Sequence, residues 1–305
     1  MDVAERLADR FEEQRDRLRA LAYRMLGSLT EAEDAVQEAW LRLDRAGADD
    51  IGNLPGWLTT VTGRICLDML RSRTARREEP MTEGFDTFVP DPVLRALERS
   101  DPEREVLRAD SVGTALLVVL ETLEPAERLA FVLHDMFAVP FDDIARIVER
   151  SPAATRQLAS RARRRVRGAT PAADPDLGRQ REVFDAFRAA SVAGDFDALL
   201  AVLHPDVVLR ADAGTAGGVT ASKLVRGARQ VAEQAMLFRR FTGRTRLVLV
   251  NGGIGALAVP EGKPPVSVMS VTVAEGRITG MYILADRERL AGLDLSGLDL
   301  SGPGG

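Results

Sequence analysis

The chain is poor in cysteine, histidine and lysine, with one, two and two of these residues among 305. A lone cysteine, Cys66, excludes both a disulfide framework and a thiolate metal site, so a reducing cytoplasm is the expected setting. The N-terminus, MDVAERLADR, is charged from the start, and no apolar run approaches the roughly 18 residues that a membrane span needs. We therefore expect a cytoplasmic protein without a membrane segment, a bound metal or another cofactor.

Charge is unevenly distributed along the chain. There are 41 basic and 46 acidic residues, a net charge of -5, and 39 of the 41 basic residues are arginine. Residues 153–168 nevertheless contain no acid and six arginines: Arg156, Arg161, Arg163, Arg164, Arg165 and Arg167. This local excess indicates a polyanionic partner, or else a highly solvated surface. At 305 residues, two or three domains are expected.

The arginine-rich stretch forms the second half of a predicted helix-turn-helix, residues 141–168. Apolar residues recur at helical spacing in both halves: Ile144, Ala145, Ile147 and Val148, then Ala154, Leu158, Ala162 and Val166. Between the halves, Ser151 can cap the second helix and Pro152 suits its first position. With the apolar stripe inward, Arg156, Gln157, Ser160 and either Arg163 or Arg164 project outward, as a major-groove reader requires. A solvated basic helix in a bundle is the alternative.

Residues 1–78 predict three helices. Gly27 ends the first, Thr30 and Glu33 have the form of a capping box for the second, and Pro55 opens the third. The second helix carries an acidic outer face: Glu31, Glu33, Asp34, Gln37 and Glu38. The third ends in four arginines: Arg71, Arg73, Arg76 and Arg77. An acidic helix is thus followed by a basic one.

Two blocks of sequence carry a family resemblance. AEDAVQEAWLRL (residues 32–43) and PGWLTTVTGRICLDMLRSR (residues 55–73) resemble region 2 of the extracytoplasmic-function (ECF) sigma factors, the promoter-recognition subunits of bacterial RNA polymerase. Residues 136–167 resemble region 4 of the same family. The matched order of the two blocks is more specific than either block alone. The resemblance implies two partners, the RNA polymerase core enzyme and promoter DNA.

The resemblance also implies roles for individual residues. Contacts with the core polymerase fall to Glu33, Asp34, Gln37 and Glu38. Contacts with the -10 element fall to Trp57, Arg64, Asp68, Arg71 and Arg73. Contacts with the -35 element fall to Thr155, Arg156, Gln157, Ser160 and Arg161, with Arg163 and Arg164 near phosphates. Many family members have Asn where Arg64 stands, so their -10 preference does not carry over. Structural alternatives remain open: a core position for Trp57, an ion-pair role for Asp68 and a solvated face for the acidic set.

The predicted linker, residues 79–110, loses helical periodicity and contains several prolines. Its FVPDPVL segment, residues 88–94, resembles the WLPEPL-like motif of one sigma group that carries an added C-terminal domain, with Phe88 in place of tryptophan. An apolar island in such a linker indicates a contact, and we expect it to pack on the C-terminal domain. Packing on the sigma regions is the alternative.

Residues 175–290 predict helices followed by a meandering sheet, an α+β domain with its helices on one face. The opening of this block resembles the SnoaL-like (NTF2-like) cone, a fold that holds a pocket for a possible small ligand. His204, before Pro205, is expected to be structural rather than catalytic. A glycine-bearing loop replaces the family's DGGG motif, so the resemblance assigns regulation to six residues: Phe88, Pro90, Asp212, Gly214, Gly217 and Gly218. ADRERL (285–290) only loosely matches an NPDKL-like motif, and residues 291–305 form a predicted flexible tail.

The prediction is a multidomain chain with two all-α sigma domains, region 2 (1–78) and region 4 (111–168), followed by an α+β SnoaL-like cone. We expect a sigma factor rather than an enzyme, modulated in cis by an intramolecular contact between the C-terminal domain and the sigma regions. One alternative is a helix-turn-helix regulator that never joins the polymerase. Another is a SnoaL-like enzyme domain, with His204 or Asp212 as acid or base, fused to a DNA-binding module.

Overall fold

The computed structural model describes residues 3–47, 51–77, 87–97, 112–169, 173–214, 222–242, 245–260 and 262–298. The chain divides into two compact units. Unit 1 comprises Met1–Thr82 and Val119–Ala169, and unit 2 comprises Glu83–Val118 and Thr170–Gly305. None of the described helices is long and apolar enough to cross a membrane. Residues 87–97, the described part of the predicted linker, thus belong to the same unit as the C-terminal domain.

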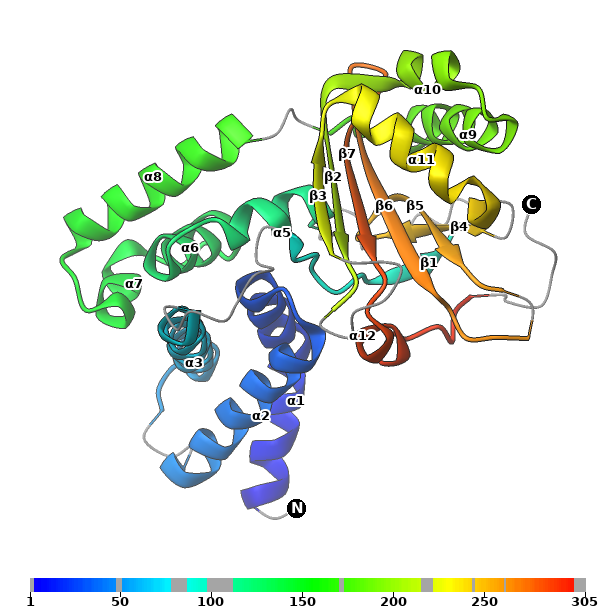
Figure 1. Ribbon diagram of the computed structural model, residues 1–305. Coiled ribbons are helices and arrows are strands. Elements are labelled where there is room, and N and C mark those ends of the chain that lie inside the picture. Colours follow the sequence, from blue (N-terminus) through cyan, green and yellow to red (C-terminus); the bar gives the residue numbers. More distant parts are fainter. Residues whose placement is uncertain are drawn as a thin grey trace. The chain divides into compact units, whose positions relative to one another are not determined.

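Unit 1 is helical (Figure 1). Its elements are α1 (Val3–Leu26), α2 (Leu29–Ala46), α3 (Leu54–Arg77), the end of α5 (Thr114–Glu121), α6 (Pro125–Phe131), a π-helical turn η2 (Val132–Met136), α7 (Phe141–Val148) and α8 (Pro152–Ala169). α1, α2 and α3 bury apolar side chains against one another, including Leu18, Leu58 and Ile65. Gly27 follows α1 with φ 69°, the left-handed geometry that favours glycine, as expected for a helix end.

The start of α2 differs from the prediction. Ser28 is the N-cap, and its hydroxyl accepts a hydrogen bond from the Glu31 backbone N–H. Thr30 lies inside the helix, so the predicted Thr30–Glu33 capping box is wrong. Serine and threonine are both good caps, and sequence alone does not decide between residues two positions apart.

The two sequence blocks of unit 1 pack together. Gly63 on α3 leaves room for Leu129, Leu133 and Ile147, whose methyl groups would lie 3.4, 3.5 and 3.8 Å from a Cβ at that position. Arg128 on α6 is 3% exposed and pairs with Glu121 at 2.8 Å. It also donates to the Met25 carbonyl at the C-terminal end of α1, at 2.8 Å. A buried arginine therefore satisfies a helix-end carbonyl of the other block.

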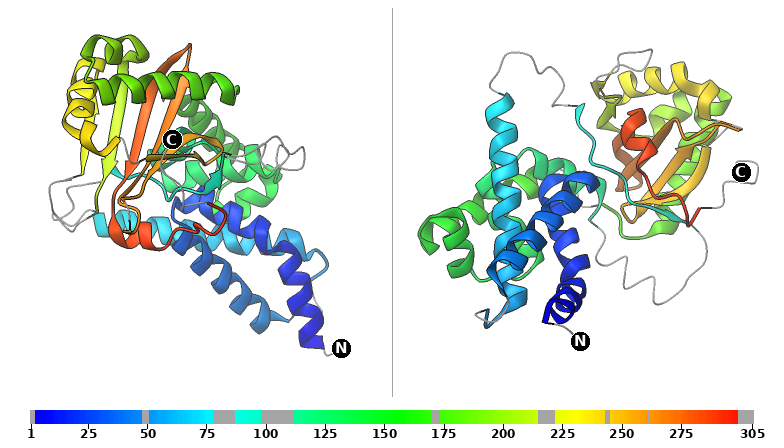
Figure 2. Two further views of the ribbon diagram at one scale, coloured as in Figure 1. Left: turned by 90° about the vertical axis from the view of Figure 1, so that its right-hand side faces the viewer. Right: turned by 90° about the horizontal axis from the view of Figure 1, so that it is seen from below.

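Unit 2 is built on a seven-stranded sheet of order β1-β4-β5-β6-β7-β2-β3. The strands are β1 (Leu94–Ala96), β2 (Leu203–Asp212), β3 (Lys223–Arg226), β4 (Thr245–Val250), β5 (Gly253–Ala258), β6 (Ser267–Ala274) and β7 (Arg277–Leu284). β2 and β7 pair in parallel, and the other neighbours are antiparallel. Helices α9 (Leu177–Ala193), α10 (Phe196–Val202) and α11 (Ala228–Thr242) cover one face (Figures 1 and 2). The predicted fold class, helical domains followed by an α+β domain, is confirmed.

Strand alternation gives the sheet two apolar faces. On β4, Leu247 and Leu249 pack with the helices, whereas Val248 and Val250 pack on the opposite face. That opposite face also holds Val89 from the predicted linker and residues from the short helix α12 (Arg287–Ala291) and beyond it. The C-terminal domain is therefore a layered structure whose second face is covered by chain from elsewhere in the sequence.

Candidate nucleic-acid interface and linker clamp

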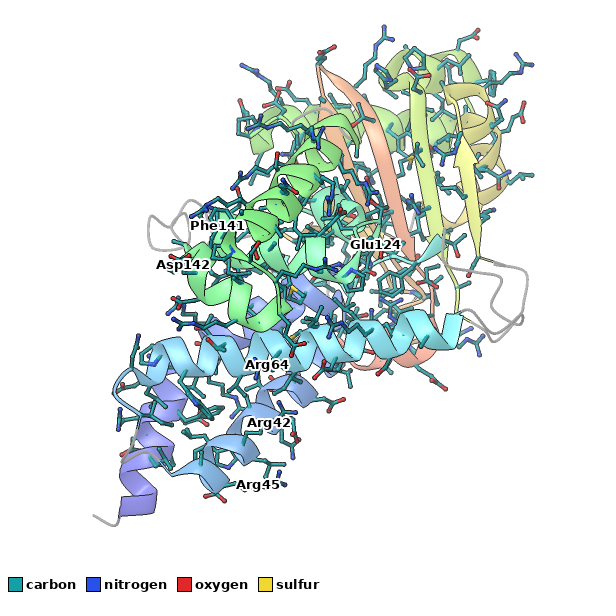
Figure 3. The ribbon with its side chains drawn as sticks, turned by 90° about the vertical axis from the view of Figure 1, so that its left-hand side faces the viewer. Arg42, Arg45, Arg64, Glu124, Phe141 and Asp142 are labelled. Atoms are coloured by element: carbon teal, nitrogen blue, oxygen red, sulfur yellow. The ribbon has the colours of Figure 1, made fainter. Side chains whose placement is uncertain are left out.

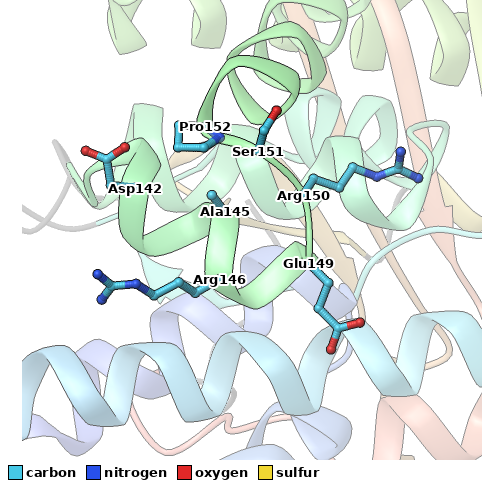
Figure 4. A pocket seen from close by; sticks show the side chains of 7 residues that line it. All are labelled: Asp142, Ala145, Arg146, Glu149, Arg150, Ser151 and Pro152. Atoms are coloured by element: carbon cyan, nitrogen blue, oxygen red, sulfur yellow. The ribbon is translucent and has the colours of Figure 1, made fainter.

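The turn between α7 and α8 has the geometry that the sequence predicts. α7 ends at Val148, and its C-cap Glu149 has the left-handed φ of 57°. The Ser151 hydroxyl accepts a hydrogen bond from the Ala154 N–H at 3.2 Å. Pro152 is the first residue of α8. Figure 4 shows the hollow that this turn forms, lined by Asp142, Ala145, Arg146, Glu149, Arg150, Ser151 and Pro152. The predicted helix-turn-helix is confirmed as a local structure.

One face of α8 is free to meet another molecule. Gln157, Ser160 and Arg164 are exposed and follow each other at intervals of three and four residues, so they share one side of the helix. The Arg156 guanidinium lies 5.6 Å from the Phe141 ring centroid, a cation–π arrangement that orients it at the start of this face. Thr155 does not lie on this face, contrary to its predicted -35 contact. Its side chain is fully buried, and its hydroxyl donates to the Ser151 carbonyl at 3.0 Å.

Three of the six arginines already have acidic partners. Glu127, 6% exposed, accepts from Arg161 at 2.6 Å and from Arg165 at 3.1 Å. Asp135 accepts from Arg163 at 2.6 Å. These acids precede the arginines by about 30 residues, which is why charge counting within 153–168 missed them. Arg161 and Arg163 thus hold α8 to α6 and η2, and the basic face is carried by Arg156, Arg164 and Arg167.

The predicted -10 residues divide between exposed and structural positions. Arg64 is exposed on α3 (Figure 3), and its guanidinium donates to the Arg146 carbonyl on α7 at 3.1 Å. Asp68 and Arg71 are exposed and 3.9 Å apart. Trp57 is half-buried against the α1–α2–α3 core. Arg73, predicted to contact the -10 element, instead has partners within unit 1. It donates to the Leu26 carbonyl at 3.0 Å and pairs with Glu31.

The acidic face of α2 is partly paired. Glu33 accepts from Arg15 at 3.3 Å and Arg19 at 3.2 Å, and Glu38 accepts from Arg42 at 2.9 Å. Asp34 and Gln37 are exposed. Leu41, one turn beyond Gln37, is 39% exposed and was not among the predicted residues. The open part of this face is therefore a mixed acidic and apolar strip: Asp34, Gln37 and Leu41.

The predicted linker segment is held on the C-terminal domain through Arg289 of α12. Its Nε atom donates to Asp91 at 2.6 Å, its Nη1 atom to Asp212 at 2.7 Å and its Nη2 atom to the Val89 carbonyl at 2.5 Å. The guanidinium also lies 5.0 Å from the Phe88 ring centroid. We call Asp91, Asp212 and Arg289 the linker clamp. Its two carboxylate side chains are only 8% and 11% exposed.

Further bonds fix the segment along the sheet. Asp212 accepts from the Val89 N–H at 3.2 Å, and Asn251 accepts from the Val93 N–H at 2.9 Å. Asn251 also donates to Thr114 at 3.2 Å, and residues 94–96 pair with β4 as strand β1. The expectation that residues 88–94 pack on the C-terminal domain is confirmed, with Pro90 buried.

The remaining predicted regulatory residues border the clamp. Gly214 donates its N–H to Asp212 at 3.1 Å, has φ 67°, and a side chain there would collide with Asp286. Gly217 and Gly218 lie outside the described residues. Arg289 belongs to the ADRERL stretch but was not named among the candidate residues. The sequence shows only that Arg289 is a basic residue in a short segment after the last strand. Its position opposite Asp91 is a result of the fold.

Two groups that could serve catalysis have structural surroundings. His204 accepts a hydrogen bond from the Asp206 N–H at 3.1 Å, within the first residues of β2. Cys66 is fully buried, and burial raises the pKa of its thiol, which keeps it protonated and unreactive.

Comparison with known proteins covers both units. A Sigma-70 region 2 model matches residues 10–76 and a Sigma-70 region 4 model matches residues 114–166. The chain is 40% identical to the ECF RNA polymerase sigma factor SigJ of Mycobacterium tuberculosis, over 97% of this chain and 95% of that protein. It is 36% identical to the probable ECF sigma factor SigI of the same species, over 88% and 90%. The crystal structure of M. tuberculosis SigJ superposes with a TM-score of 0.73 at 37% identity, over 94% and 99% of the two chains.

Proposed function

The chain belongs to the extracytoplasmic-function RNA polymerase sigma factors, which direct the polymerase to promoters, and we propose that its C-terminal domain controls this activity in cis. The observation that carries the proposal is the linker clamp. The chain between region 2 and region 4 is bonded to the C-terminal domain at Val89, Asp91, Val93 and Thr114. Whatever loosens these bonds changes how freely the two regions can take up their separate positions.

Within unit 1, regions 2 and 4 pack against each other, and we propose that the held linker favours this packing. α3, which carries the proposed -10 residues, contacts α7 of the helix-turn-helix through Gly63 and Arg64. A promoter presents its -10 and -35 elements at separate places, so region 2 and region 4 must part to bind both. We propose that the described arrangement is the resting form and that a held linker favours it.

Run-off transcription tests control in cis. The full chain and a chain ending after Ala173 are compared with core polymerase on the same set of promoters. The proposal predicts different outputs for the two chains. Identical output at every promoter would remove the C-terminal domain from the account.

The proposed polymerase-docking surface is the strip of Asp34, Gln37 and Leu41. Replacing Asp34 by arginine is expected to weaken binding to core polymerase about tenfold, ~1.4 kcal/mol, because it reverses a charge on an exposed docking face. Asp16→Arg, an equally exposed reversal on α1, is the matched control and should bind as the unaltered chain does. Equal affinities of the two variants for core polymerase would place the docking surface elsewhere.

The proposed -35 reader is the exposed face of α8. Gln157→Ala should cost about 1–3 kcal/mol at a single base position, because the amide can form paired hydrogen bonds with a base edge. Arg164→Ala should instead weaken binding to all sequences and lower the salt slope by about one unit, as loss of a phosphate contact does. Binding of the reconstituted holoenzyme to a panel of -35 variants at several salt concentrations separates the two effects. A uniform loss for Gln157→Ala would contradict its assignment to base reading.

The enzyme alternative has less support. The relatives are sigma factors, and the two residues that the sequence offered for catalysis, His204 and Asp212, have structural partners. We therefore assign the C-terminal domain a binding and regulatory role rather than turnover.

A further inference from the structure

A cavity of about 640 Å³ lies within unit 2, between the helices and the sheet. Its lining is mainly apolar and includes the buried side chains of Phe184, Phe187, Leu209, Val231, Ala256 and Met281. A cavity of this size and character is typical of sites for small organic ligands, which need an apolar wall and a few polar anchors. None of these residues takes part in the linker clamp or in the exposed face of α8.

The charged side chains among the described residues that line the cavity are all basic: Arg188, Lys223, Lys263 and Arg287. The chain has only two lysines among its 41 basic residues, and both line this cavity. Of these, Lys263 and Arg287 are exposed, whereas Arg188 and Lys223 are partly buried. A chain with a net negative charge thus has a cavity whose described charged side chains are positive.

The wall also offers polar anchors suited to an acid. Lys223 on β3 donates to the Gln234 side-chain oxygen on α11 at 2.5 Å, and both residues line the cavity. The Gln234 amide nitrogen can donate further hydrogen bonds. Burial lowers the pKa of Lys223, so an anion beside it would favour the charged form. Ser191 on α9 is 1% exposed, lines the cavity, and its hydroxyl has no hydrogen-bond partner among the described residues. A buried hydroxyl without a partner is costly unless a ligand or water satisfies it.

We propose that this cavity binds a small amphipathic carboxylic acid. The carboxylate is held by Lys223 together with the amide of Gln234, and the apolar body lies against Phe184, Phe187 and Met281. The buried Ser191 hydroxyl can bond a further polar group of a ligand that carries one. A neutral or cationic analogue of the same length gains the apolar contacts but not the ion pair.

Binding can reach the linker because the cavity and the clamp share a wall. At the end of β2, Ala211 and the next residue but one, Ala213, line the cavity, while Asp212 between them accepts from the Val89 N–H of the linker and from Arg289. On α12, Arg287 and Leu290 line the cavity, while Arg289 between them holds Asp91. Occupancy would therefore be sensed by the strand and helix that hold the clamp. This second part rests on the proposed control in cis, whereas the binding itself does not.

Calorimetric titration of the full chain with decanoate, decanol and decylamine tests the site. We expect decanoate to bind at least tenfold more tightly than either analogue. Lys223→Met should weaken decanoate binding at least tenfold while leaving decanol unchanged, and Lys223→Arg should retain most of it. Lys263→Met, a change at the exposed rim, is the matched control and should alter decanoate binding by no more than about twofold.

A second variant keeps the test decisive if Lys223→Met does not fold. Ala235→Phe places bulk in the cavity from a half-buried helical position and should weaken decanoate and decanol alike. Equal affinity for decanoate and decanol, unchanged decanoate binding in Ala235→Phe, or no binding of any of the three probes would overturn the proposal. Hydrogen exchange at the Val89 and Val93 amides with and without decanoate tests the coupling separately. Tight binding without a change there would leave the site standing and remove its link to the linker.

Discussion

Replacing Arg289 by methionine should release the linker from the C-terminal domain and cost about 3–5 kcal/mol of local stability. The substitution removes one guanidinium that serves two nearly buried carboxylates and a backbone carbonyl. Asp91 and Asp212 are then left close together without their shared cation, which is the most costly way to break a buried ion pair. Methionine keeps much of the side-chain volume, so the loss reports on the charge and its hydrogen bonds.

Hydrogen exchange at the Val89 and Val93 amides measures the release. Both amides donate to residues of the C-terminal domain, so both should lose protection in Arg289→Met. Arg229→Met is the control, because Arg229 and Glu233 form an exposed pair with side chains 73% and 55% accessible. Such pairs contribute about 0–1 kcal/mol, so the control should leave exchange unchanged. Full protection in Arg289→Met would show that β1 and the apolar contacts alone hold the linker.

Arg128→Met should destabilise unit 1 by about 3–5 kcal/mol. Arg128 is 3% exposed, holds both carboxylate oxygens of Glu121 at 2.8 and 3.2 Å, and donates to the Met25 carbonyl. Methionine fills much of the space but leaves Glu121 and the end of α1 without their donor. The α1 and α6 amides should therefore exchange faster, whereas those of the C-terminal sheet should not.

A double variant separates the ion pair from simple packing. In Arg128→Met with Glu121→Gln, the charge left behind is removed, so part of the lost stability should return. Arg42→Met, which breaks the surface pair with Glu38, serves as the control and should cost less than about 1 kcal/mol. A double variant as unstable as the sum of the two single ones would mean that the pair itself contributes little and that Arg128 acts through its shape.

Secondary structure was predictable where it depends on hydrophobic periodicity and capping residues within a short stretch of sequence. The stripe of Ile144, Ile147 and Leu158, with the Ser151 cap, specifies the helix-turn-helix within one short stretch of sequence. Contacts with a partner distant in the sequence were not predictable. Arg161 pairs with Glu127, 34 residues earlier, and Arg73 donates to the Leu26 carbonyl, 47 residues earlier. A partner so far away in the sequence cannot be recognised from the local pattern of residues.

The same reason explains what was missed in the C-terminal domain. β1 is three residues long and pairs with Val248–Val250, about 150 residues later, so no alternation could show it. The sequence shows that lysine is rare in this chain, but only the fold brings Lys223 and Lys263 to one cavity. Conversely, the packing of residues 88–94 was predictable because an apolar segment between prolines must be buried against something.

The central claim is that the C-terminal domain controls the sigma regions by holding the linker. Run-off transcription with core polymerase, comparing the full-length chain with Arg289→Met and Arg229→Met, tests it most directly. We predict that Arg289→Met raises the output above that of the unaltered chain, because regions 2 and 4 part more readily, and that Arg229→Met matches the unaltered chain. Equal output from all three proteins, with loss of linker protection verified in Arg289→Met, would contradict the claim.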